Sequence, residues 1–208
     1  MEVIPRLIVK INNNYKNMKN KYSVFWSFLI MAFILVIPFI SFAEEYSFDP
    51  SNVISDTTMF DYDSMSIGDI QSFLQIKGSM LAWTITEDCK GDMKTAAEII
   101  YLAANEYHVN PKLLLAFLQK EQSLITLENP SQSRFDWAMG YAVCDGCEHD
   151  DVRIQKYKGF GKQVDNAAGA MRFYTDKASI YGYIRSVEEN VTIDGQNFVL
   201  KNQATANL

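Results

Sequence analysis

One uncharged apolar run divides this chain of 208 residues and constrains everything that follows it. Residues 24–43, VFWSFLIMAFILVIPFISFA, are long enough to cross a bilayer. Lysines precede the run, and Ser41-Phe42-Ala43 before Glu44 has the small-x-small pattern of a signal-peptidase site. The sequence therefore predicts an exported protein, extracellular, periplasmic or associated with the cell wall. Residues 1–43 are either a cleaved signal peptide, which the site pattern favours, or a transmembrane anchor.

The chain after this segment is acidic. Removing residues 1–43 removes five of the 19 basic residues and one of the 25 acidic ones, which leaves 14 against 24. A net charge near −10 disfavours nucleic acid and anionic membranes as partners, so we expect membrane contact only through residues 24–43. A polysaccharide partner remains open, because its recognition depends on hydrogen bonds and aromatic stacking. No pattern indicates an organic cofactor.

All three cysteines follow the export segment and would face a compartment in which disulfides persist. Cys144 and Cys147 are separated by the turn dipeptide Asp-Gly, so a local bridge is one option. A bridge from Cys89 to either of them is another, and the sequence leaves the pairing open. A zinc site with His149 has enough ligands but only one standard spacing, so we favour a structural disulfide and expect no metal.

Hydrophobic periodicity predicts a mainly α fold. Helix-capping signals and apolar spacing of three and four indicate helices at residues 66–77, 95–108, 110–125 and 163–174. Asp194-Gly195 between two apolar stretches predicts a β-hairpin near the C-terminus. We therefore expect residues 44–90 to be a polar, loosely packed lead-in with one short helix, and residues 91–208 to form the main domain. His108 is expected to end its helix as a C-terminal cap.

Glu121 interrupts the apolar stripe of the predicted helix 110–125. With Leu113 at zero, the other apolar residues fall within about 140° and Glu121 falls near 80°, in the middle of the arc. A carboxylic acid in such a stripe stays protonated near neutral pH, because desolvation disfavours its charge. Glycoside cleavage needs a proton donor of this kind. Alternatively, the helix is rotated, or Glu121 lies at the edge of the core and pairs with Arg134 or Arg172.

Three segments together resemble the lysozyme-like superfamily, specifically goose-type lysozymes and soluble lytic transglycosylases. LLLAFLQKEQSLI at residues 113–125 is similar to the catalytic helix, in which a glutamate follows an apolar run. WAMGY at 137–141 is similar to a Gly-Leu-Met-Gln-like turn that lines the sugar cleft, and NAAGAMRF at 166–173 is similar to a helix behind the cleft. The resemblance covers roughly residues 95–174.

The resemblance implies a lysozyme-like helical domain that cleaves the glycan strands of peptidoglycan. Glu121 would be the general acid/base of a lytic transglycosylase or muramidase, and no second carboxylate is needed if the substrate's N-acetyl group is the nucleophile. Substrate contacts are implied for the following residues: Ser123, Trp137, Met139, Tyr141 and Tyr174. Two departures bear on these contacts, because Gln122 separates Glu121 from Ser123 and Tyr141 stands near the place of the family's Gln.

Two other functions are consistent with the sequence. A cell-wall-binding or scaffold protein would keep the lysozyme-like fold without turnover, in accord with the missing Gln. A membrane-anchored thiol enzyme would use Cys144 with a histidine, although Cys147 would quench that nucleophile in an oxidising compartment. The family ends in further aromatic residues that close the cleft, so a chain ending at Leu208 is consistent with a truncated domain.

Overall fold

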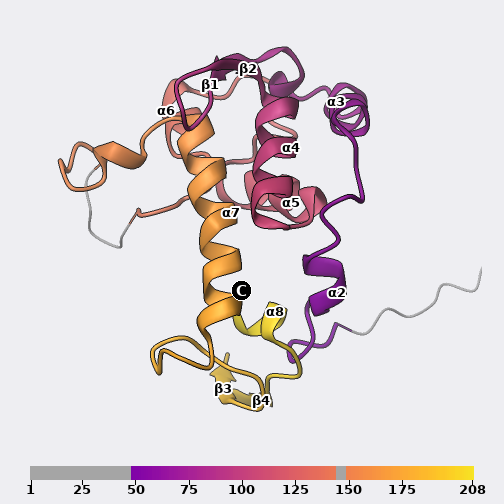
Figure 1. The fold of residues 1–208 in the computed structure, drawn as a ribbon, viewed down its shortest axis with the longest axis vertical. Helices are drawn as coiled ribbons and strands as arrows, with labels where there is room; N and C mark the ends of the chain where they lie inside the picture. The colour runs from indigo at the N-terminus through magenta and orange to yellow at the C-terminus, as the bar shows by residue number, and fades with distance from the viewer. Residues whose placement is uncertain (1–47, 144–148) are drawn as a thin grey trace, which may run out of the picture. The chain divides into compact units, whose positions relative to one another are not determined.

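The computed structural model describes residues 48–143 and 149–208, which belong to one compact unit, Phe48–Leu208 (Figure 1). The predicted export segment, Cys144 and Cys147 lie outside the described residues. No helix in the described ranges is long and apolar enough to span a membrane. The unit is mainly helical, as predicted.

The described helices and strands occur in the following order. The α-helices are α2 (Asp56–Met59), α3 (Ile67–Ile76), α4 (Ala96–Tyr107), α5 (Pro111–Gln122), α6 (Gln132–Asp136), α7 (Phe160–Lys177) and α8 (Gln203–Ala206). Two 3-10 helices are η1 (Met80–Trp83) and η2 (Gln155–Tyr157). One antiparallel hairpin pairs β1 (Ile85–Glu87) with β2 (Met93–Thr95), and a second pairs β3 (Asn190–Ile193) with β4 (Gln196–Val199). The second hairpin confirms the Asp-Gly prediction.

Side-chain caps fix where the main helices begin. Ser66 and Thr95 each form a capping box at the starts of α3 and α4, and the Asn110 side chain accepts a hydrogen bond from Lys112 N at 2.9 Å. His108 ends α4 in a left-handed conformation, with φ at 52°, as expected of a C-terminal cap. The helix predicted at 163–174 is longer than expected and begins at Phe160.

The expected lead-in is part of the main core rather than a loose segment. Met59, Ile70 and Leu74 are fully buried in the same apolar cluster as α4 and α5. Asn110 ties α5 to this region, because its backbone N–H donates to Met59 O at 2.8 Å. Near the C-terminus, Ala204 N donates to Asp56 Oδ1 at 2.7 Å. The described chain is therefore not divided at residue 90.

Gly161 allows the first turn of α7 to approach the β1–β2 hairpin. A Cβ at this position would lie 2.4 Å from Glu87 O and 2.5 Å from Asp88 Cα. Both atoms belong to the backbone, which cannot move aside as a flexible side chain can. We therefore regard Gly161 as a packing requirement for the whole α7 helix.

We predict that Gly161→Ala lowers the free energy of unfolding by about 1–3 kcal/mol, because it forces α7 away from the hairpin. Gly68→Ala in the first turn of α3 is the matched control, because its nearest neighbour would be Ser66 Oγ at 3.7 Å. The control should raise the free energy of unfolding by up to about 1 kcal/mol through helix propensity. Urea denaturation of both variants tests this, and equal effects would contradict the packing argument.

Candidate active site

Glu121 lies at the margin of the buried face of α5, so its predicted place in the middle of the stripe is wrong. The buried leucines of α5 are Leu114, Leu115 and Leu118. On the same helical projection they centre near roughly 150°, about 70° away from Glu121. The prediction included residues 124 and 125, but α5 ends at Gln122 and their angles do not apply. The Glu121 side chain is 28% exposed.

The chain turns sharply immediately after Glu121. Ser123 has a left-handed conformation, with φ at 58°, and its N–H donates to Gln119 O at 2.9 Å. Leu124 N donates to Leu118 O at 3.1 Å, and both leucine side chains are fully buried. The bond from Ser123 N–H to Gln119 O is that of an αL motif, in which a left-handed residue ends the helix. The motif fixes the last turn of α5 and therefore the direction of the Glu121 side chain.

The structure brings Glu121 together with the WAMGY turn. Gly140 has φ at 63°, and a Cβ built on it would lie 2.9 Å from Glu121 Oε2. The carboxylate therefore lies directly against the turn backbone, and a side chain at this position would displace it. Two segments that the resemblance placed at one sugar cleft are thus neighbours in the fold.

A buried amide that the sequence analysis missed holds this turn. Gln163 is fully buried, and its Oε1 accepts hydrogen bonds from Met139 N at 3.3 Å and Tyr141 N at 3.0 Å. Its Nε2 donates to Tyr141 O at 3.1 Å and Tyr157 O at 3.0 Å. The signal in the sequence was a glutamine on the inward face of a helix whose other inward residues are apolar or small.

The side chains of the WAMGY turn at residues 137–141 differ in how far they are buried. Trp137 is 2% exposed and Met139 is 5% exposed, so both belong to the core that supports the turn. Trp137 also stacks on His149, with ring centroids 5.3 Å apart. Neither side chain has a free surface that a sugar could contact. We therefore assign Trp137 and Met139 a role in supporting the turn, and no direct contact with substrate.

Tyr141 and Tyr174 remain accessible candidates for sugar contact. Tyr141 is half-buried and packs edge to face against Tyr157, with centroids 5.2 Å apart. Burial raises the pKa of Tyr141, and the neighbouring Tyr157 and Tyr174 hydroxyls add to the rise. Tyr174 is 41% exposed. An aromatic group thus adjoins the turn that contacts Glu121.

Neither arginine that the sequence suggested as a partner pairs with Glu121. Lys120 Nζ lies 2.8 Å from Glu121 Oε1, and the lysine side chain is 71% exposed. Arg134 instead donates to the last carbonyl of α5, and Arg172 pairs with an aspartate on its own helix. The Glu121 carboxylate therefore has an exposed basic neighbour on one oxygen and Gly140 beside the other.

Three aspartates that follow Glu121 in the chain have partners of their own. Asp136 pairs with Lys158 at 3.4 Å, and Asp165 accepts a hydrogen bond from the Tyr107 hydroxyl at 3.2 Å. Asp151 pairs with an arginine two residues along the chain. Asp150 is exposed, and residue 145 lies outside the described residues. Asp136, Asp151 and Asp165 are therefore each explained by a contact within the protein.

A separate cavity of about 490 Å³ lies between the β1–β2 loop, α4 and α7, and its lining includes Cys89, Tyr107 and Asp165. Partial burial raises the pKa of the Cys89 thiol, and contact with Asp165 adds to the rise. Burial is also the main cause that raises the pKa of Tyr107 to about 12. A protonated thiol is a poor nucleophile, so this cavity has no activated cysteine.

Cys89 has no disulfide partner among the described residues. Because the other two cysteines lie outside them, the predicted disulfide and its pairing stay predictions. Within residues 48–143 and 149–208, no group of three or more His, Cys, Asp or Glu side chains could hold a metal ion.

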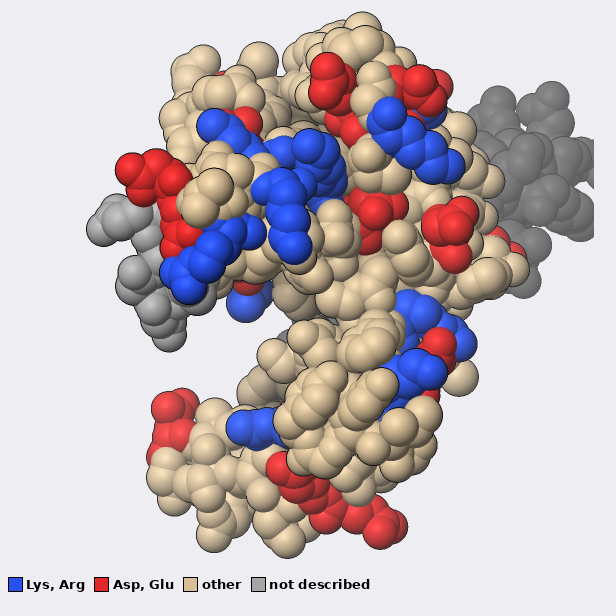
Figure 2. All heavy atoms as spheres, turned by 60° about the vertical axis from the view of Figure 1, so that its left-hand side comes forward, with Lys and Arg blue, Asp and Glu red and all other residues tan. Residues whose placement is uncertain are grey.

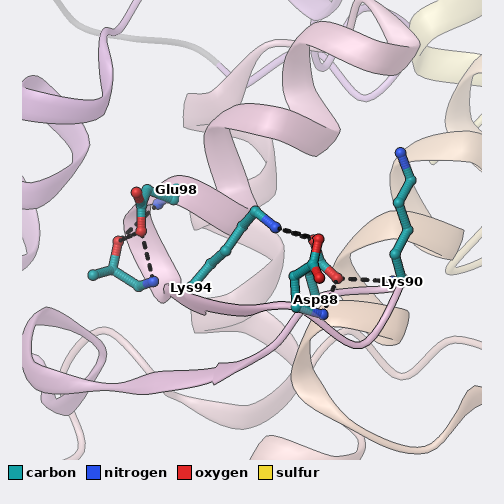
Figure 3. Close-up of polar contacts among 6 residues, drawn as sticks. Asp88, Lys90, Lys94 and Glu98 are labelled. Carbon is teal, nitrogen blue, oxygen red and sulfur yellow. Dashed lines mark hydrogen bonds and ion pairs between the residues drawn. The ribbon is translucent and has the colours of Figure 1, made fainter.

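The β1–β2 loop beside this cavity is organised by one carboxylate (Figure 3). Asp88 Oδ2 accepts a hydrogen bond from Lys94 Nζ at 2.6 Å, while its Oδ1 accepts bonds from Lys90 N at 2.8 Å and Asp92 N at 2.9 Å. The hydrogen bond from Lys94 is the main cause that lowers the pKa of Asp88 from 3.8 to about 2. The bonds favour the ionised carboxylate in the folded protein.

We predict an acid-sensitive contribution from Asp88. Because its pKa is lower in the folded state, the contribution is complete above about pH 4 and is lost as pH falls toward about 2. Asp88→Asn should be less stable than wild type at neutral pH, and the difference should shrink across this interval. Urea denaturation at several pH values tests it, with the exposed Asp150→Asn as control. A constant difference at all pH values would contradict the prediction.

Comparison with known proteins identifies one family. The model of the LasA N-terminal domain matches residues 52–205, which nearly coincide with the compact unit seen in the structure. No curated protein and no solved structure matches the chain. The matched region covers well over half of the sequence, from before α2 into α8. The protein therefore belongs to the LasA N-terminal domain family.

Proposed function

We propose that this protein is exported and cleaves the glycan strand of peptidoglycan between N-acetylmuramic acid and N-acetylglucosamine, with Glu121 as the general acid/base of a lysozyme-like domain. The observation that carries the proposal is the position of the Glu121 carboxylate against Gly140, beside Tyr141. A fixed helix end, a turn held by a buried amide and an accessible aromatic ring meet there. A positioned carboxyl group can act as a general acid, and an aromatic ring can stack on a sugar face.

The proposed reaction needs one carboxyl group. In its neutral form Glu121 donates its proton to the glycosidic oxygen as the bond from the anomeric carbon to that oxygen breaks. The substrate's N-acetyl oxygen attacks the anomeric carbon and forms a cyclic intermediate. Glu121, now ionised, accepts the proton of the neighbouring 6-hydroxyl as that oxygen closes an anhydro ring and expels the N-acetyl oxygen. If water attacks instead, the product has a reducing end.

The Lys120–Glu121 ion pair does not prevent this chemistry. Lys120 is largely exposed, and exposed ion pairs contribute only about 0–1 kcal/mol. A glycan that enters beside Gly140 can therefore displace the lysine at small cost. The 28% exposure of Glu121 leaves the carboxylate accessible to such a ligand.

The same exposure favours a second candidate function, a cell-wall-binding or scaffold protein without turnover. A general acid is usually helped by a dry, apolar pocket, whereas Glu121 borders solvent and pairs with a lysine. In this alternative the turn and the tyrosines bind glycan, and Glu121 contributes a hydrogen bond only. The two functions differ in whether the glycan is cut.

We predict that wild-type protein releases soluble muropeptides from purified peptidoglycan and that Glu121→Gln slows release by about 10²- to 10⁴-fold. Mass spectrometry of the products separates anhydro ends, made by a lytic transglycosylase, from reducing ends, made by a muramidase. The exposed Glu128→Gln is the control and should retain activity. Binding to the wall without cleavage by any form would support the scaffold function instead.

A second prediction tests the contact between Gly140 and Glu121. Gly140→Ala should lose most of the activity, because its methyl group would displace the carboxylate. Gly78→Ala is the matched control: its φ is 67°, but no atom lies within 4 Å of its Cβ position. Both variants should lose similar stability, about 1 kcal/mol, from the left-handed backbone. Equal loss of activity in the two folded variants would refute the role of this contact.

A further inference from the structure

A row of exposed aromatic side chains follows the C-terminal half of α7. Phe173 is 42% exposed, Tyr174 and Tyr181 are each 41% exposed, and Tyr183 is 71% exposed. Large aromatic rings grouped at the surface of a folded domain usually mark a binding surface.

The rings of this row are ordered relative to one another. Phe173 and Tyr181 lie nearly parallel, with an angle of 23° and centroids 6.1 Å apart. Tyr181 and Tyr183 have an angle of 25° and centroids 5.5 Å apart. Both separations exceed direct face-to-face contact, so the rings are offset and form steps. We call Phe173, Tyr181 and Tyr183 the aromatic shelf.

The shelf and the turn of the candidate active site are joined by one helix. Tyr174 packs edge to face on Phe173, with centroids 5.8 Å apart, and both residues belong to α7. Tyr141 follows Gly140, which contacts Glu121. Gln163, which holds Tyr141, lies ten residues before Phe173 on this helix, a rise of roughly 15 Å.

The turn that carries the outer rings is anchored. Tyr181 N donates to Lys177 O at 3.0 Å, and Ile184 N donates to Tyr181 O at 3.0 Å. The Ile184 side chain is buried, and Gln203 of α8 donates to Arg185 O at 2.8 Å. The shelf is therefore held before any ligand binds, which reduces the entropy lost on binding.

The surrounding surface suits an extended ligand. Figure 2 shows the described domain hollowed between a broad upper part and a smaller lower part. In Figure 1 the lower part carries β3 and β4, and α7 runs from one part to the other. The shelf belongs to the end of α7 and the turn that leads to β3. An extended ligand bound at the shelf would therefore lie along the end of α7.

We propose that the aromatic shelf binds additional sugar rings of the glycan strand, away from the bond that Glu121 cleaves. The proposal rests on the proposed glycan substrate and deepens it. Stepped rings offer apolar faces at intervals comparable with successive sugars, and the tyrosine hydroxyls offer hydrogen bonds to sugar hydroxyls. A glycan is favoured over a protein partner because α7 also carries Gln163, which holds the turn of the proposed glycan-cleaving site.

The test is binding by the purified full-length chain carrying Glu121→Gln, which prevents turnover. The probes are the trimer and the hexamer of β-1,4-linked N-acetylglucosamine, measured by titration calorimetry. Tyr181→Ala and Tyr183→Ala should each weaken hexamer binding about tenfold and leave trimer binding unchanged. Tyr183→Phe, which keeps the ring, should weaken it far less.

Trp83→Ala is the matched control for removing an exposed aromatic ring. Trp83 is 70% exposed and ends η1, beside the β1–β2 hairpin at the opposite end of the domain from β3 (Figure 1). Its removal should not change hexamer binding. Circular dichroism of each variant confirms that the fold is retained.

The outcomes separate the two proposals. Unchanged hexamer binding in both folded tyrosine variants, or no hexamer binding by the parent protein, would overturn the shelf. Self-association that the tyrosine variants abolish, without any effect on hexamer binding, would make the shelf a contact between copies and would also overturn it. Shelf-dependent hexamer binding, together with peptidoglycan digestion that does not depend on Glu121, would support the shelf and refute the proposed catalytic role.

Discussion

Four hydrogen bonds made by one buried amide determine the geometry around Glu121. Gln163 satisfies the backbone of the turn at residues 139–141 and the carbonyl of Tyr157, and no described polar side-chain atom is left buried without a partner. An apolar residue at this position would leave several buried backbone groups unsatisfied, at about 1–3 kcal/mol each. The position of Gly140, and with it the surface against which Glu121 lies, follows from this side chain.

Helix α7 extends this constraint across the domain. Its 18 residues span roughly 27 Å, and successive turns meet different parts of the fold. Gly161 meets the β1–β2 hairpin, Gln163 holds the turn, and Gly169 lies beside the Tyr107 ring of α4. The last turns carry Phe173 and Tyr174 at the surface. One rigid helix thus positions the candidate active site and the aromatic shelf together.

Local signals predicted the helix starts well, because capping depends on neighbouring residues. Ser66, Thr95 and Asn110 all cap the expected helices, and Asp194-Gly195 forms the expected hairpin. The β1–β2 hairpin was missed because strands of three residues show no usable alternation.

The errors concern features that depend on tertiary packing. The rotation of α5 was misjudged because the left-handed turn at Ser123 ends the helix before Leu124, which is buried from outside the helix. The exposure of Phe173 was not predicted, because residue type alone does not show which face of a helix is covered. Gln163 was overlooked because the four backbone groups that form hydrogen bonds with its amide belong to segments up to 24 residues away in the sequence.

The partial exposure of Glu121 makes the proposed chemistry depend on the ligand itself. In the free protein one carboxylate oxygen faces Lys120 and the other lies against Gly140. A sugar stacked beside Tyr141 would exclude water from this position and separate the carboxylate from its exposed lysine. Electrostatic interactions strengthen as water leaves a site. Under the proposal, glycan that is held along α7 would bring its scissile bond to Glu121 and exclude water there, which links binding at the shelf to cleavage at the carboxylate.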